Sequence, residues 1–101
     1  IFRHSEHSSY EILTKNVLKK KMMPVLIRIE ANGKTNVEQN QPGTEKFIFV
    51  LEGVVEADIN GTKFRLSKHN TFYFDASLPH HFINKGKLIA RVLCVGTPVS
   101  L

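Results

Sequence analysis

The sequence predicts an all-β domain, either a sandwich or a barrel built from short antiparallel strands. Runs rich in aromatic and β-branched residues recur along the chain, with turn residues about every ten positions between them. No segment shows the apolar period of an amphipathic helix. The run at residues 47–51 is apolar in both of its alternating sets, which predicts a central strand covered on both faces.

Length and composition predict one globular domain over residues 1–101. The chain is 42% hydrophobic and 23% charged, and no run approaches the roughly 20 apolar residues of a membrane span. It begins at Ile1 without a methionine, so we expect a piece of a longer protein. Its single cysteine, Cys94, lies in an apolar run, which predicts a buried thiol in the reducing cytoplasm.

The N-terminal third is expected to form irregular chain followed by two strands. Residues 1–9 are polar and irregular, and residues 10–18 mix apolar with polar side chains as an edge strand does. Residues 22–31 alternate more clearly, and Pro24 places the start of this strand at an edge or a bulge. The pair Asn32-Gly33 predicts a turn.

The central strand is expected to carry one polar side chain into the interior. A polar approach at residues 39–44 precedes the run at 47–51, and Gly53 ends it. Alternate residues of a strand point to the same face. Lys46 shares the phase of Ile48 and should therefore point inward at the mouth of the strand.

The second half of the chain is expected to hold the remaining strands. The pair Asn60-Gly61 predicts a type I′ hairpin turn, since both residues accept positive φ. Phe64 and Leu66 should continue the buried face on the return strand. Other strands are expected at residues 55–59, 71–74, 80–84 and 88–95.

Two segments match a known pair of motifs. Residues 49–53 (FVLEG) match the end of G-x5-H-x-H-x3–4-E-x6-G, and residues 72–84 match G-x5-P-x-G-x2-H-x3-N through His80 and Asn84. On these residues the chain resembles the cupin superfamily, which implies a jelly-roll β-barrel. The closer likeness, over roughly residues 10–98, is to the C-terminal cupin of XRE-type helix-turn-helix transcription regulators.

The departures from these motifs imply a domain without a metal or another cofactor. By the resemblance, Lys46 stands where the family has its metal-binding glutamate, and Gln39 and Gln41 stand at its two histidines. His80 is the retained ligand position. An ammonium has no lone pair to give a cation, and amide carbonyls are weak neutral ligands.

The same positions are the expected ligand-binding residues: Gln39, Gln41, Lys46, Ile48, His80 and Phe82. Lys46 is either an anion-binding cation or a side chain that reaches the rim to pair with Glu45 or Glu52. The glutamines supply amide groups to a ligand or belong to a solvated loop. His80 contacts the ligand or bonds to backbone, and Phe82 shares its inward phase.

The resemblance implies a sensor of a small molecule in a regulator, acting as a homodimer. The net charge of +5 and Lys46, Arg28 and Arg91 favour an anionic effector. The lysines at 19–21 lack the interleaved aromatics of a single-strand surface, so this segment is not expected to bind DNA. The resemblance implies that a separate N-terminal domain binds DNA.

Two other functions remain open from the sequence. One is a small stand-alone cupin enzyme, an isomerase or a dioxygenase, with His80 as acid or base and Lys46 stabilising an oxyanion. The other is a degenerate barrel that serves only as a platform for dimerisation. No membrane partner is expected.

Overall fold

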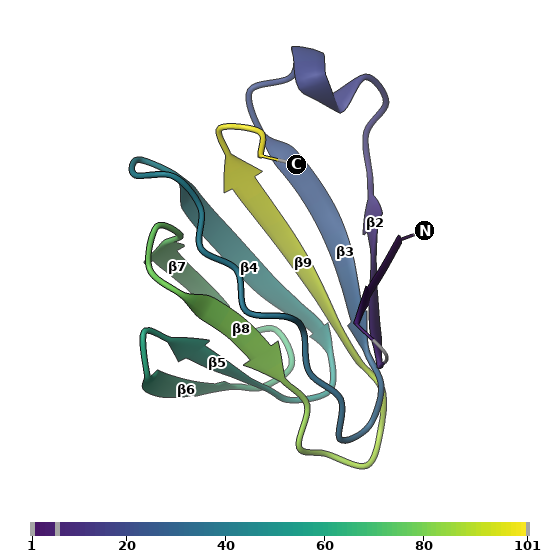
Figure 1. The fold of residues 1–101 in the computed structure, drawn as a ribbon. Coiled ribbons are helices and arrows are strands. Elements are labelled where there is room, and N and C mark those ends of the chain that lie inside the picture. The colour runs from purple at the N-terminus through teal and green to yellow at the C-terminus, as the bar shows by residue number, and fades with distance from the viewer. Residues whose placement is uncertain (1, 6, 101) are drawn as a thin grey trace.

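The computed structural model describes residues 2–5 and 7–100, and it confirms the all-β prediction. Its strands form two antiparallel sheets that face each other (Figure 1). A single turn of 3-10 helix, η1 (Val17–Lys19), interrupts them. Within the described residues, no helix has the length and apolar character needed to cross a membrane.

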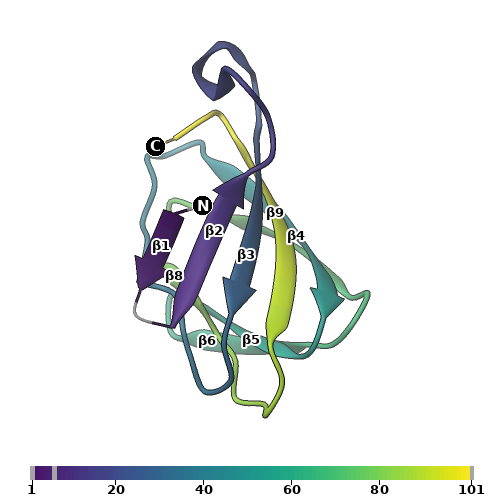
Figure 2. The ribbon, with the colours of Figure 1, turned by 90° about the vertical axis from the view of Figure 1, so that its right-hand side faces the viewer.

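The larger sheet has six strands in the order β1-β2-β3-β9-β4-β7. Figure 2 shows β2, β3, β9 and β4 side by side in this layer. The bounds of its strands are β1 Phe2–Ser5, β2 Ser8–Ile12, β3 Met23–Ile29, β4 Glu45–Glu52, β7 Thr71–Asp75 and β9 Ala90–Thr97. The central run at 47–51 thus lies inside the sheet, between β9 and β7.

The smaller sheet has the order β6-β5-β8, with β5 at Val55–Ile59, β6 at Thr62–Leu66 and β8 at His80–Ile83. The chain between β3 and β4 runs along the free side of β8 (Figure 1), where Lys34 bridges to Ile83 and Glu38 to His80. This irregular segment takes the place of a fourth strand. It brings Thr35 and Glu38 to the space between the sheets.

The core fills the space between the sheets and follows the alternation of the strands. Ile48 and Val50 of β4 are fully buried and point inward, as their phase predicts. Phe47, Phe49 and Leu51 point outward and are only half-buried. The prediction that this strand is covered on both faces is therefore wrong, because no described element packs over the outer face of the larger sheet.

The β5–β6 hairpin confirms its predicted turn. Asn60 has φ 51° and Gly61 has φ 90°, the positive values that a type I′ turn requires. The backbone N–H of Gly61 also donates to Asp58 Oδ1 at 2.9 Å. On the return strand Leu66 is buried as expected, but Phe64 is 38% exposed, because β6 is the outer strand of the smaller sheet.

The N-terminal predictions need correction. Residues 2–5, expected to be irregular, form β1 and pair with β2, so β2 lies inside the sheet instead of at its edge. The strand predicted at 10–18 ends at Ile12. Long-range pairing decides both points, since β2 aligns on β3 from Ser8 to Ile12.

Candidate ligand-binding cavity

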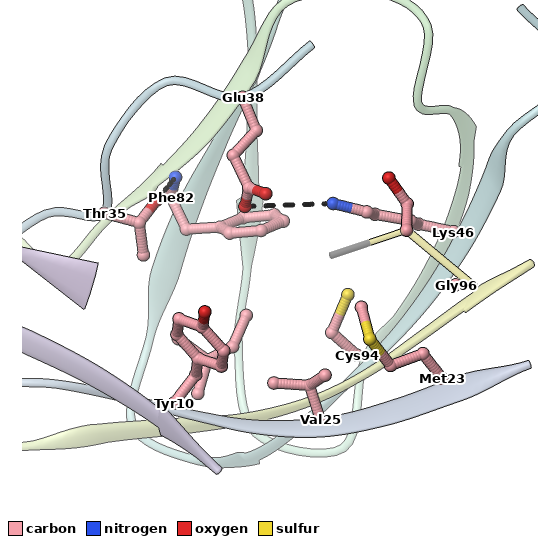
Figure 3. A pocket seen from close by; sticks show the side chains of 11 residues that line it. Tyr10, Met23, Val25, Thr35, Glu38, Lys46, Phe82, Cys94 and Gly96 are labelled. Carbon is pink, nitrogen blue, oxygen red and sulfur yellow. Dashed lines mark hydrogen bonds and ion pairs between the residues drawn. The ribbon is translucent and has the colours of Figure 1, made fainter. Parts of the chain in front are cut away.

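A cavity of about 100 Å³ opens between the two sheets, near the C-terminal end of the described chain. Its floor is apolar and comes from β3 and β9: Met23, Val25, Ile27 and Cys94. Its polar lining consists of Tyr10, Thr35, Glu38, Lys46 and Ser100. Figure 3 shows Glu38 and Lys46 facing each other at one end, with Tyr10, Val25 and Cys94 opposite. The cavity therefore pairs an apolar floor with one charged end.

Lys46 reaches this interior from β4, which confirms its predicted inward phase. It is 8% exposed, and its neighbour across the β4–β9 ladder is Gly96. A Cβ at Gly96 would lie 3.5 Å from Lys46 Cγ, so the bare backbone gives the lysine stem room to lie over β9. Lys46 Nζ ends 3.0 Å from His80 Nε2 and 3.8 Å from Glu38 Oε1.

The alternative pairing of Lys46 with Glu45 or Glu52 at the rim is wrong. Glu52 forms an ion pair with Arg91 at 2.9 Å, and Glu45 accepts a hydrogen bond from the Tyr73 hydroxyl. The side chain of Glu45 points to the opposite face of β4 from that of Lys46. Glu52 lies beyond the irregularity in the β4–β9 register after Val50. The acidic partner of Lys46 comes instead from the segment between β3 and β4.

His80 is held as a neutral imidazole by its two hydrogen bonds. Its Nδ1 lies 2.8 Å from the carbonyl oxygen of Leu78, which only accepts, so Nδ1 carries the proton. Nε2 then has the lone pair and accepts from Lys46 Nζ at 3.0 Å. Burial lowers the pKa of His80, the Leu78 bond opposes this, and the Lys46 charge lowers the pKa further. The ring is 1% exposed.

This lowered pKa makes stability depend on pH. An unfolded histidine takes up its proton near pH 6.5, but folded His80 does so only at lower pH. Between the pKa of folded His80 and about pH 6.5, the unfolded chain binds more protons than the folded chain. The contribution of His80 to the free energy of unfolding is therefore complete above about pH 6.5 and decreases as the pH falls below it. We expect His80→Gln to flatten the loss of Tm between about pH 7.5 and about pH 5.5. Parallel Tm curves for the two proteins would contradict this assignment.

Glu38 is the functional residue that sequence reasoning missed. Its backbone pairs with that of His80 in both directions, N–H to O at 2.9 and 2.8 Å, although no strand pattern marks this segment. Its side chain is 44% exposed, with Oε1 directed at Lys46. The charge of Lys46 could have predicted such a residue, because a lysine that points into the interior requires an acidic partner from a nearby segment.

The other predicted site residues divide between the cavity and its surroundings. Phe82 lines the cavity and is 3% exposed. Ile48 is fully buried in the core and is not among the lining residues. Gln39 and Gln41 are exposed and line a separate surface hollow, which shares only Glu38 and Ser100 with the cavity. The structure thus brings Lys46, His80 and Phe82 together and leaves the two glutamines outside.

Cys94 is buried at the floor of the cavity, as predicted. Burial raises the pKa of its thiol to about 11, so about one molecule in a thousand is a thiolate at pH 8. We expect iodoacetamide to alkylate the folded protein at least about a hundredfold more slowly than the urea-unfolded chain, as read by mass spectrometry. Equal rates would show that the thiol is accessible and ionised.

With this geometry described, comparison with known proteins assigns the family. The family model for a cupin domain matches residues 25–96, well over half of the chain. The chain belongs to the cupin family. A curated relative, the tetracenomycin polyketide synthase protein TcmJ of Streptomyces glaucescens, is 26% identical over 70 residues, or 69% of this chain. This cupin spans 47% of that protein's length.

Solved structures share the cupin fold at low sequence identity. The cupin domain of an XRE-family transcriptional regulator from Enterobacter cloacae has a TM-score of 0.85 and 15% identity, over 94% of this chain and 100% of that one. A cupin-superfamily sugar phosphate isomerase from Silicibacter pomeroyi has a TM-score of 0.79 and 21% identity, over 93% and 61%. These likenesses establish the jelly-roll fold and leave the activity of this cupin to its own residues.

The donor groups of this cupin do not fit the metal that the family motifs imply. The histidine nitrogen that would face an ion, Nε2 of His80, accepts from the Lys46 ammonium. Among the described residues, no group of three or more His, Cys, Asp or Glu side chains is placed to hold an ion. A cation beside Lys46 would meet a like charge where the family supplies a carboxylate.

Proposed function

We propose that this cupin binds a small anionic molecule in the cavity beside Lys46 and acts as the effector-sensing domain of a transcription regulator. The observation that carries the proposal is the buried ammonium of Lys46 at the charged end of a cavity with an apolar floor. The proposal needs no metal or other cofactor.

The surroundings of Lys46 favour an anion. Two unit charges about 4 Å apart attract by about 4 kcal/mol at an effective dielectric constant near 20, against about 1 kcal/mol in water. A lysine 8% exposed therefore attracts an anion more strongly than an exposed lysine does. Its bond to neutral His80 holds Nζ in place without cancelling the charge.

The regulator context rests on the sequence motifs and on the fold shared with the XRE-family cupin domain. In this proposal the domain pairs with a second copy, and a separate N-terminal domain binds DNA. Binding of the ligand to the cupin domain changes the affinity of the dimer for DNA. By linkage, binding of DNA changes the affinity for the ligand by the same factor. The protein would act in the cytoplasm.

The enzyme alternative has less support from the geometry. Both ring nitrogens of His80 are engaged, one by Leu78 and the other by Lys46, and His80 is not among the lining residues of the cavity. A general acid or base must lie within hydrogen-bond reach of its substrate. Lys46 is placed to bind charge, and binding is therefore the function we favour.

Thermal-shift measurements with short carboxylic acids, sugar phosphates and their neutral analogues test the proposal. A ligand that binds only the folded state raises Tm with concentration. Lys46→Gln keeps a donor for His80 and removes the charge, so we expect affinity for the anion to fall about ten- to hundredfold. If no anion raises Tm, or Lys46→Gln binds as well as the wild type, the proposal fails and the platform role gains support.

A further inference from the structure

We propose that Glu38 is an internal competitor for the ligand of Lys46, and that this ligand is a short-chain monocarboxylate. The inference rests on the proposed function, since it assigns the chemical class of the molecule bound there. It also gives the segment between β3 and β4 a role in setting affinity.

The contacts of Lys46 are those of a cation with an incomplete set of anionic partners. His80 Nε2 supplies one acceptor at 3.0 Å, and Glu38 Oε1 lies at 3.8 Å, beyond ordinary hydrogen-bond length. The carboxylate of Glu38 therefore neutralises Lys46 without a close bond. A ligand carboxylate that approached to about 2.8 Å would bind the ammonium more strongly than Glu38 does.

The Glu38 side chain has a path out of the cavity. Its backbone is held to His80 by two hydrogen bonds, but the side chain is 44% exposed and reaches the surface hollow beside Gln39 and Asn40. In this proposal the carboxylate moves from Lys46 toward that hollow when a ligand binds.

The apolar floor sets the size of the remainder of the ligand. The cavity of about 100 Å³ is lined by Met23, Val25, Ile27 and Cys94, with Phe82 at one side. A dry cavity of about 150 Å³ accommodates benzene, so this space suits a molecule of about four carbons. A carboxylate head at Lys46 and a short alkyl tail on the floor match these two ends. A second charged group placed on this floor would lie against apolar side chains without a partner.

Titration calorimetry with butyrate tests the competition directly. We expect Glu38→Gln to bind butyrate about fivefold more tightly than the wild type, since Lys46 is then always available and a partly exposed ion pair reduces apparent affinity by about that factor. Butyramide, the neutral isostere, should bind both proteins alike. Glu52→Gln is the matched control: it removes an exposed carboxylate paired with Arg91 on the outer face and should leave butyrate affinity unchanged.

The outcomes separate this inference from the proposed function. If butyrate binds the wild type and Glu38→Gln with equal affinity, or the variant more weakly, competition is refuted while the binding function stands. If the same gain appears in Glu52→Gln, it reflects overall charge and the inference also fails. If butyrate binds neither the wild type nor Glu38→Gln, the monocarboxylate assignment falls, and another anion that depends on Lys46 would preserve the proposed function alone.

Discussion

Lys46→Glu is expected to convert the interior of this cupin into a divalent-cation site. The substitution removes the ammonium from His80 Nε2 and places a carboxylate beside the lone pair of the imidazole and near the carboxylate of Glu38. Imidazole and carboxylates are suitable ligands for zinc. At zinc about a hundred times its Kd, linkage adds about 2.7 kcal/mol, which raises the Tm of a domain of this size by about 10 °C or more.

The metal-free variant should be less stable than the wild type, because two carboxylates then approach each other without a cation between them. Lys46→Gln is the control for loss of the lysine, and the double variant Lys46→Glu/His80→Gln identifies the site, since neither should gain Tm with zinc. A zinc response of equal size in the double variant would place the ion elsewhere. It would contradict the view that the ammonium occupies the metal position.

Asn84→Ala is expected to destabilise the fold by about 3 kcal/mol, or roughly 15 °C in Tm. The side chain is 1% exposed, and its Nδ2 lies 2.8 to 3.2 Å from the carbonyl oxygens of Ile29, Glu30 and Leu88. Its Oδ1 accepts from the N–H of Gly86 at 2.9 Å, so the same amide also caps the turn that follows β8. One amide thus joins the end of β3 to the turn before β9.

Urea denaturation measures this effect, with Asn70→Ala as the matched control. Asn70 Oδ1 also accepts hydrogen bonds within a turn, from Ser67 N and Oγ, but the residue is exposed and water replaces those bonds. We expect the control to lose about 1 kcal/mol or less. Asn84→Asp should cost more than Asn84→Ala, because a buried carboxylate cannot donate to the three carbonyls. Similar losses at Asn70 and Asn84 would show that burial does not matter.

Local patterns were enough to predict the strands from residue 22 onward and the inward direction of Lys46, whereas β1 was missed and β2 was predicted too far along the chain. A period of two assigns side chains to faces wherever one face is buried, so β4 places Lys46 with Ile48 and Val50. The Asn60-Gly61 turn was equally local, because positive φ at two successive residues selects those residue types. These features depend on neighbours in the chain alone.

The partners of Lys46 depend on contacts that no local pattern encodes. Glu38 reaches the cavity because an irregular segment pairs with β8, about forty residues farther along the chain. The same pairing determines that the side chains of Gln39 and Gln41 are exposed. Asn40 turns toward the protein, with its N–H on Ala76 and its Nδ2 on Ser100, and the residues on either side of it face solvent.

The placement of the two tyrosines gives this cupin a built-in optical reporter. The chain contains no tryptophan, so its ultraviolet emission comes from Tyr10 and Tyr73. Tyr10 lines the cavity, and Tyr73 is 62% exposed on the outer face of the larger sheet. Filling the cavity changes the surroundings of one fluorophore and leaves the other as an internal reference, so unlabelled protein reports its own occupancy.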